Sequence, residues 1–168
     1  VPALLLGKPL GDILEVYFQQ AGQYTDKLAF NAPTLFALLP GTWELSPDAM
    51  GLLARAGILA AFLLCLLVMG LLYRHRRSLD HSAWMAAALV LAVGVPYLLP
   101  YMHERYFFLA DVIAAAWACA QWMRLPLAVC VEGGSLASYV VYLRLKYNWI
   151  LYAFGTYWVM AGESLLML

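Results

Sequence analysis

The sequence is poor in charged residues, which make up 12% of its 168 positions, and neither sign of charge is in excess. Soluble domains average about 25% charged residues, so this is not the composition of a soluble domain. Ten basic residues against ten acidic ones also give no net basic charge of the kind that nucleic-acid binding requires. Hydrophobic residues form 65% of the chain and the mean hydropathy is +0.77. We therefore expect an integral membrane protein.

Paired cysteines and the common nucleotide or metal motifs are also missing. Cys65, Cys119 and Cys130 have none of the spacings typical of zinc or redox sites. They lie in apolar runs, where free cysteine packs as a small hydrophobic residue. The chain has no GxGxxG, Walker, HExxH or GxSxG sequence. Nucleotide binding and metal-dependent hydrolysis are therefore unsupported, and we expect no metal site and no bound cofactor in this chain.

Residues 1–49 differ from the rest of the chain, because they contain seven charged side chains and five prolines. Positions 11–23 carry apolar residues at helical spacing and predict an amphipathic helix at the membrane interface. The sequence Asn31-Ala-Pro33 then breaks the chain, and residues 34–39 predict a second short interfacial helix. We interpret residues 1–49 as an extracytoplasmic loop with interfacial amphipathic helices.

Both ends of the chain lie in apolar sequence. It begins at Val1 rather than at a methionine, and residues 1–6 resemble the end of a preceding membrane helix. It ends at Leu168 inside an apolar run. We expect this chain to be part of a longer polypeptide, covalently continuous with an N-terminal half.

Residues 50–168 predict a transmembrane bundle of about five helices, since crossing a bilayer takes about 20 apolar residues. The expected spans are 52–73, 83–99, 106–123, 127–143 and 149–168. Ser46-Pro47 predicts the start of the first helix, with serine as N-cap and proline at the first helical position. Pro96 and Pro100 predict a bend or an end in the second helix, at 83–99. The expected fold class is an all-α, polytopic transmembrane bundle.

The orientation follows from the distribution of basic residues. Arg74, Arg76 and Arg77 form the densest basic cluster, and the positive-inside rule places such a cluster in the cytoplasm. Residues 1–49 and the segment 103–105 then lie on the outer face. The localisation that we expect is multi-pass, in a bacterial inner membrane.

The first candidate site is formed by His103, Glu104 and Arg105, which stand between two apolar runs. Charged groups at such a junction are costly unless they face water, protein or a ligand. Arginine offers a rigid donor fork that suits phosphate, and histidine can donate to a phosphate oxygen. The alternative is a charged loop in which Arg105 reaches lipid headgroups without any specific ligand.

Other polar residues are weaker candidates. Asp111 and Glu132 are intramembrane acids, and Glu163 is expected at the wet end of the last span. Such acids usually face a bundle interior, where they form a structural pair or relay protons. Tyr24 and Asn31 belong to the loop that would contact a substrate, although an asparagine before a proline often only stabilises a turn.

Three of these segments resemble, in order, those of bacterial integral-membrane glycosyltransferases of the GT-C class, related to the lipid-dependent mannosyltransferases. They are LAFNAPTLFALLP at 28–40, LPYMHERYFFLAD at 99–111 and GSLASY at 134–139. The resemblance covers most of residues 10–145. The second segment is the most specific of the three. This chain has Thr34 where the family often has asparagine, and Leu109 where proline is common.

The resemblance implies transfer of a sugar from a polyprenyl-phosphate carrier, with inversion, on the extracytoplasmic face. It implies that His103, Glu104 and Arg105 lie near the donor phosphate. The family's catalytic acid belongs to an early outward loop that this chain does not contain. The chain alone would then lack that acid, and any divalent metal would be held by the other half.

Two other classes of function remain open. One is a membrane transporter or lipid-handling subunit in which Asp111, Glu132 and Arg105 line a polar path. The other is a structural membrane subunit whose charged residues pair between helices. A donor site predicts a cavity open to the lipid at the outer end. A transporter predicts polar residues that continue across the midplane, and a structural subunit predicts buried pairs without a cavity.

Overall fold

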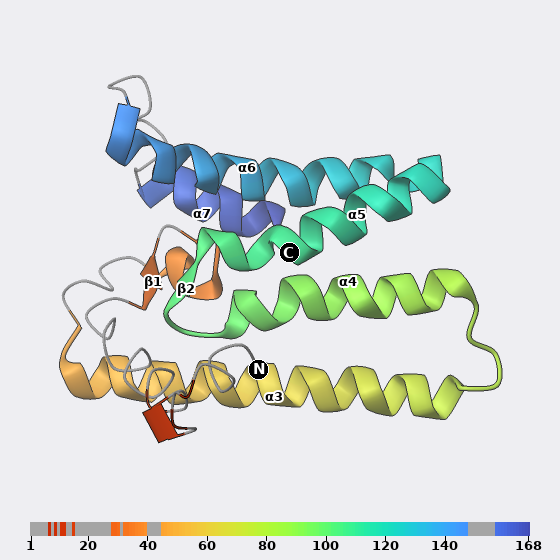
Figure 1. The fold of residues 1–168 in the computed structure, drawn as a ribbon, viewed down its shortest axis with the longest axis horizontal. Helices are drawn as coiled ribbons and strands as arrows, with labels where there is room; N and C mark the ends of the chain where they lie inside the picture. The colour runs from red at the N-terminus through yellow and green to blue at the C-terminus, as the bar shows by residue number, and fades with distance from the viewer. Residues whose placement is uncertain are drawn as a thin grey trace.

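The computed structural model describes residues 7, 9, 11–12, 15, 28–30, 32–39, 45–147 and 157–168 (Figure 1). The described chain is an all-α fold with one two-residue strand pair. The long helices are α3 (Pro47–His75), α4 (His81–Leu98), α5 (Phe108–Ala120), α6 (Leu125–Tyr147) and α7 (Tyr157–Leu166). Helices α3 to α6 lie side by side in chain order, and α7 packs on α6.

Short elements connect or precede these helices. The strands are β1 (Ala29–Phe30) and β2 (Met102–His103), and the 3₁₀ helices are η1 (Leu35–Leu38), η3 (Glu104–Phe107) and η4 (Trp122–Arg124). The strands, η1 and η3 gather at one end of the bundle. The α3–α4 turn and the α5–α6 connection lie at the opposite end (Figure 1).

The helix starts follow from local capping. The Ser46 side chain accepts a hydrogen bond of 3.3 Å from the backbone N–H of Ala49, and Pro47 is the first helical residue, which confirms the prediction. Asp80 caps α4 in the same way, accepting from the N–H of Ala83 at 2.8 Å. Pro96 lies inside α4, which ends at Leu98.

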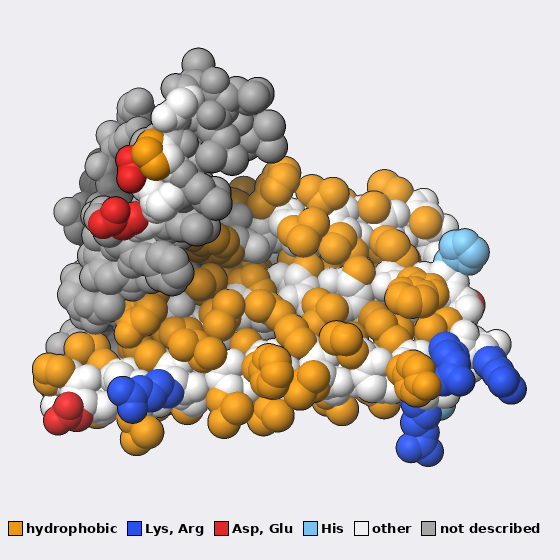
Figure 2. Space-filling model, turned by 60° about the horizontal axis from the view of Figure 1, so that its bottom comes forward, with side chains coloured by type: hydrophobic (Ala, Val, Ile, Leu, Met, Phe, Trp, Pro, Cys, Tyr) orange, Lys and Arg blue, Asp and Glu red, His pale blue; other side chains and the backbone are white. Residues whose placement is uncertain are grey.

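Two of the described helices, α3 and α4, are long and apolar enough to cross a membrane. The 29 residues of α3 correspond to about 43 Å of helix, more than the ~30 Å of a bilayer core. Only 17% of the most apolar 18-residue stretch of α3 is buried inside the protein. Figure 2 shows hydrophobic side chains covering the exposed face of this helix. The described lengths of α5 and α7, 13 and 10 residues, are shorter than a full span, so five spans stay a prediction.

The main core lies between α4, α5, α6 and α7. Phe107 and Ala110 are fully buried in it. Several contacting positions are alanine, and small residues let membrane helices approach closely. The remaining buried members of this core are Ala32, Leu89, Ala92, Tyr97, Ala114, Trp117, Ala118, Ala128, Val131 and Met167. A smaller cluster of Leu28, Phe36 and Ala54 joins the N-terminal loop to α3.

The structure describes one of the two helices predicted in residues 1–49 completely and the other only in part. Residues 34–39 contain a short helix, η1, whose Phe36 and Ala37 are buried against the bundle, and its position at a membrane interface stays a prediction. Phe36 is large and apolar, and it fits beside Gly57 of α3, which explains the burial. Gly11, Asp12 and Glu15 are helical. The rest of the predicted helix at 11–23, and residues 1–6, lie outside the described residues.

Candidate functional site

The two sequence segments that define the candidate site lie side by side. Strands β1 and β2 pair in parallel, with Ala29 opposite Met102 and Phe30 opposite His103. The backbone N–H of Tyr101 donates to the carbonyl oxygen of Leu28 at 2.8 Å, which extends the contact. The segment before the Asn-Ala-Pro sequence is therefore fixed against the segment that carries the His-Glu-Arg sequence.

The turn that brings the chain from α4 into β2 is strained. Tyr101 has a φ of 62°, in the left-handed region that non-glycine residues rarely adopt, at a cost of about 1–3 kcal/mol. Its N–H is bonded to Leu28, and its side chain packs against the cluster of Leu28 and Phe36. Backbone strain that packing maintains in this way is common at functional sites.

Glu104 and Arg105 lie on different faces of helix η3, and His103 precedes the helix at the end of β2. Side chains three apart are eclipsed in a 3₁₀ helix, so Glu104 and Phe107 share the inward face, where they are 7% and 0% exposed. Arg105 lies outside that face and is exposed, while His103 is half-buried. The sequence grouped His103, Glu104 and Arg105 as one phosphate-binding set. The structure directs Glu104 into the bundle, where η3 packs against α6.

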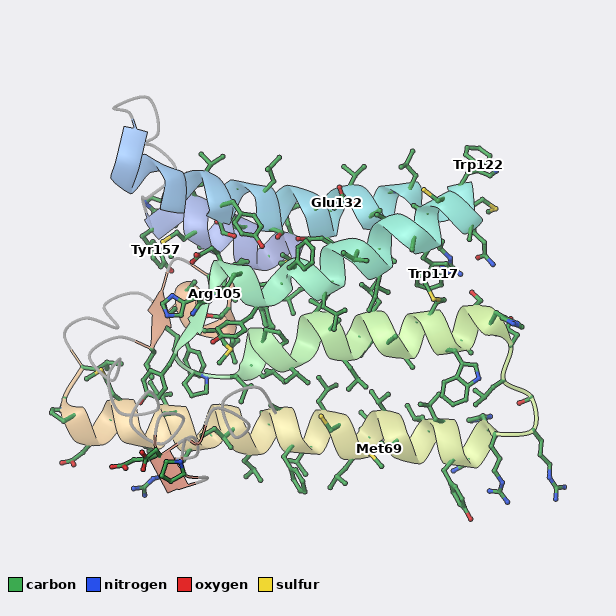
Figure 3. The ribbon with its side chains drawn as sticks, in the orientation of Figure 1. Met69, Arg105, Trp117, Trp122, Glu132 and Tyr157 are labelled. Carbon is green, nitrogen blue, oxygen red and sulfur yellow. The ribbon has the colours of Figure 1, made fainter. Side chains whose placement is uncertain are left out.

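The outward residues form a donor group around Tyr106. The Arg105 guanidinium carbon lies 5.7 Å from the centre of the Tyr106 ring, within the range of a cation–π contact. The His103 and Tyr106 ring centres are 6.3 Å apart. Figure 3 places Arg105 at the β1–β2 end of the bundle. This arrangement presents a guanidinium fork, an imidazole and a phenol, which can donate to a phosphate.

Helix α7 holds η1 in place through two hydrogen bonds. The Ser164 hydroxyl donates to the carbonyl oxygen of Thr34 at 2.9 Å, and the Tyr157 hydroxyl donates to that of Leu38 at 2.8 Å. The two donors are seven residues apart, so they share one face of the helix. No sequence pattern marked Ser164 or Tyr157, because the contact joins segments more than 100 positions apart.

A glycine allows α3 to approach this loop. A Cβ atom on Gly57 would lie 2.5 Å from the carbonyl oxygen of Leu98 and 2.7 Å from Cζ of Phe36. Those distances are too short for any other residue without displacement of the backbone at the end of α4. Gly57 thus brings α3, α4 and η1 together behind the β1–β2 pair.

Among the side chains that the structure describes, Asp111 and Glu132 have no ion pair with a basic residue, although an intramembrane acid commonly forms one. Asp111 Oδ2 accepts from the Ser135 hydroxyl at 2.7 Å, and its buried Oδ1 has no partner among the described residues. Glu132 is exposed on α6, where Figure 3 shows it about midway along the helix. Both acids line an open depression of about 390 Å³ together with Ser135 and Tyr139.

Glu163 does not lie at a wet end, as the sequence suggested, but is buried, with 4% exposure. The reason is the close approach of α7 to α6 at Gly134, where a Cβ atom would lie 3.2 Å from the Glu163 carbonyl oxygen. Glu163 Oε1 and the fully buried Thr34 Oγ1 both lack hydrogen-bond partners among the described residues.

An apolar cavity of about 370 Å³ lies between the helices. Its lining comes from α3, α4, α5, α6 and the two residues after α7, and it includes Tyr97, Trp117 and Met167. Within the described residues no cluster of three or more His, Cys, Asp or Glu side chains could hold a metal ion. Tyr24 and Asn31, the predicted loop residues, lie outside the described part of the chain, so their roles stay predictions.

No family model, no curated protein and no solved structure matches this chain.

Proposed function

We propose that this chain is the C-terminal part of a membrane glycosyltransferase that transfers a sugar from a polyprenyl-phosphate donor on the extracytoplasmic face. One observation carries the proposal: the β1–β2 pair joins the loop segment to the His-Glu-Arg segment, with Arg105 exposed beside the junction. These are the same two segments that resemble the family. The catalytic acid is proposed to lie in the N-terminal half.

The chemistry of the exposed side chains supports a phosphate ligand. Sugar transfer leaves negative charge on the phosphate oxygens of the carrier. A guanidinium and an imidazole held at a membrane edge stabilise that charge as it develops, with little reorganisation. We assign this role to Arg105 and His103. Glu104 is proposed as a positioning residue, because its burial on the inward face of η3 anchors the segment that presents Arg105.

The lipid part of the donor would lie among apolar side chains. The cavity of about 370 Å³ has a lining that is almost entirely hydrophobic, and isoprenoid chains are hydrocarbons. This supports a lipid-linked donor over a soluble one.

The test is transfer of sugar from a polyprenyl-phosphate donor by the intact protein in membranes. Arg105→Ala is expected to lower transfer by about a hundredfold or more, the loss typical of one electrostatic donor. Arg105→Lys is expected to be impaired as well, because lysine keeps the charge but not the bidentate fork. Arg55→Ala is the matched control, since Arg55 is also exposed but lies on α3. Normal turnover in Arg105→Ala would remove this residue from the donor site.

A second candidate is a transport or lipid-handling role without sugar transfer. The observation in its favour is the depression lined by Asp111, Glu132, Ser135 and Tyr139. Under this alternative, Glu132→Gln would abolish movement of a substrate across the membrane, and no donor-dependent transfer would be found. Transfer activity that survives Glu132→Gln and is lost in Arg105→Ala excludes it.

A further inference from the structure

Basic side chains gather at the end of the bundle opposite the candidate site. Arg74, Arg76 and Arg77 end α3 or follow it directly, and Arg124 ends η4. All four are exposed. Figure 2 shows Lys and Arg side chains collected around this end, and Figure 3 places Trp117 and Trp122 at the end away from Arg105. The Arg124 guanidinium carbon lies 4.7 Å from the Trp117 ring centre, which fixes Arg124 at this end.

Acidic residues do not balance these arginines locally. In the segments 74–84 and 121–124 the sequence has one acid, Asp80, against four arginines. The Asp80 carboxylate accepts a hydrogen bond from the N–H of Ala83 through Oδ1, and this bond caps α4. The end of the bundle therefore carries a positive field.

Two of the arginines are held in place by aromatic rings. Arg76 lies 4.3 Å above the centre of the Tyr73 ring, and its Nη1 donates to the Tyr73 carbonyl oxygen at 3.2 Å. Arg124 stacks on Trp117 in the same manner. Stacking limits the motion of each guanidinium and leaves other N–H donors of its fork available for an anion.

The surroundings suit a membrane surface and not a soluble anion. Trp84 and Trp122 are 54% and 81% exposed at this end, and tryptophan is enriched at the headgroup level of membranes. Two shallow depressions lie here, of about 290 Å³ at residues 74–78 and about 390 Å³ at residues 121–124. The described helices α3 and α4 are long and apolar enough to cross a membrane, and a turn between two spanning helices lies at the headgroup level.

We propose that this basic end, residues 74–78 together with 121–124, binds the anionic headgroups of membrane phospholipids. The phosphodiester is the group recognised, through the guanidinium forks. Anionic lipids are attracted to basic segments that directly adjoin membrane helices. The proposal rests on α3 and α4 crossing a membrane and not on sugar transfer, so the two proposals fail independently.

The test compares lipid retention by the purified intact protein in native mass spectrometry. The probes are phosphatidylglycerol and phosphatidylcholine with identical acyl chains. Phosphatidylglycerol is expected to remain bound preferentially. The triple variant Arg74→Gln, Arg76→Gln, Arg77→Gln is expected to lower its apparent affinity by about tenfold or more. Arg55→Gln is the matched control, because it removes an exposed arginine near the other end of α3 and should leave retention unchanged.

Two further measurements complete the test. Helical content by circular dichroism should be the same in the triple variant as in the unaltered protein, since the substituted side chains are exposed. Millimolar inorganic phosphate should not displace phosphatidylglycerol. Equal retention of the two lipids, displacement by phosphate, or full retention by a folded triple variant would overturn the proposal.

Discussion

The backbone N–H of Tyr101 donates a hydrogen bond of 2.8 Å to the carbonyl oxygen of Leu28, and this bond joins the two segments on which the proposed function rests. Tyr101 itself has a φ of 62°, in the left-handed region. Three further contacts hold the same region: the β1–β2 pair, the approach of α3 at Gly57, and the hydrogen bonds from α7 to η1. The geometry of the candidate site therefore depends on residues far from it in sequence, and this dependence can be measured.

Gly57→Ala should destabilise the protein by about 1–3 kcal/mol, the range for overpacking a filled site. The added methyl group would meet the Leu98 carbonyl oxygen and the Phe36 ring. Thermal unfolding in detergent measures the effect. Gly70→Ala is the control, because a Cβ atom at Gly70 has no neighbour within 4 Å and alanine favours helix. Equal stability of the two variants would show that α3 does not approach η1 as closely as described.

Ser164→Ala should lower the free energy of unfolding by about 1–2 kcal/mol, since it leaves the buried Thr34 carbonyl oxygen without the hydroxyl that donates to it. Because this bond fixes η1, the variant should also increase amide hydrogen exchange at residues 35–38. Ser78→Ala removes an exposed hydroxyl that donates to His75 and should leave both quantities almost unchanged. No gain in exchange at η1 would argue against the α7 contact.

The Ser135–Asp111 hydrogen bond should appear as a coupling energy. Asp111→Ala and Ser135→Ala each remove one partner of the 2.7 Å contact, and the double variant should be less destabilised than the sum of the single variants by about 0.5–3 kcal/mol. A double-mutant cycle on thermal unfolding measures this. If the losses in stability of the two single variants add up to that of the double variant, the two side chains do not interact in the folded protein.

The two ends of the bundle should react with reagents on opposite sides of the membrane. Ser78→Cys and Tyr106→Cys introduce thiols at exposed positions near opposite ends, after the three native cysteines are replaced by alanine. A membrane-impermeant maleimide should label position 106 from outside intact cells and position 78 only after the membrane is opened. Labelling of both positions from one side would refute the orientation.

The sequence predicts the helices better than it predicts the site. The long apolar run after Ser46-Pro47 defines α3 because capping and hydrophobicity are local properties. The β1–β2 pair has no local signal, since two residues per strand are too few for a periodic pattern. Tertiary hydrogen bonds such as that of Tyr101 set it instead.

The separation of Glu104 from Arg105 was also beyond sequence reasoning. A charged triplet in an apolar chain suggests one common ligand. The period of three in η3 instead turns Glu104 inward beside Phe107. Glu163 was expected near water, and its burial depends on the space that Gly134 leaves on a different helix. Such contacts between helices cannot be inferred from hydropathy.

The measurement that tests the central claim most directly is photo-crosslinking of the intact protein in membranes with a photoreactive polyprenyl phosphate, followed by mapping of the adducts. We expect adducts within residues 99–111 or 28–39, and their loss in Arg105→Ala but not in Arg55→Ala. Adducts confined to residues 74–78 and 121–124, or adducts unchanged in Arg105→Ala, would contradict the assignment of the donor phosphate to this end of the bundle.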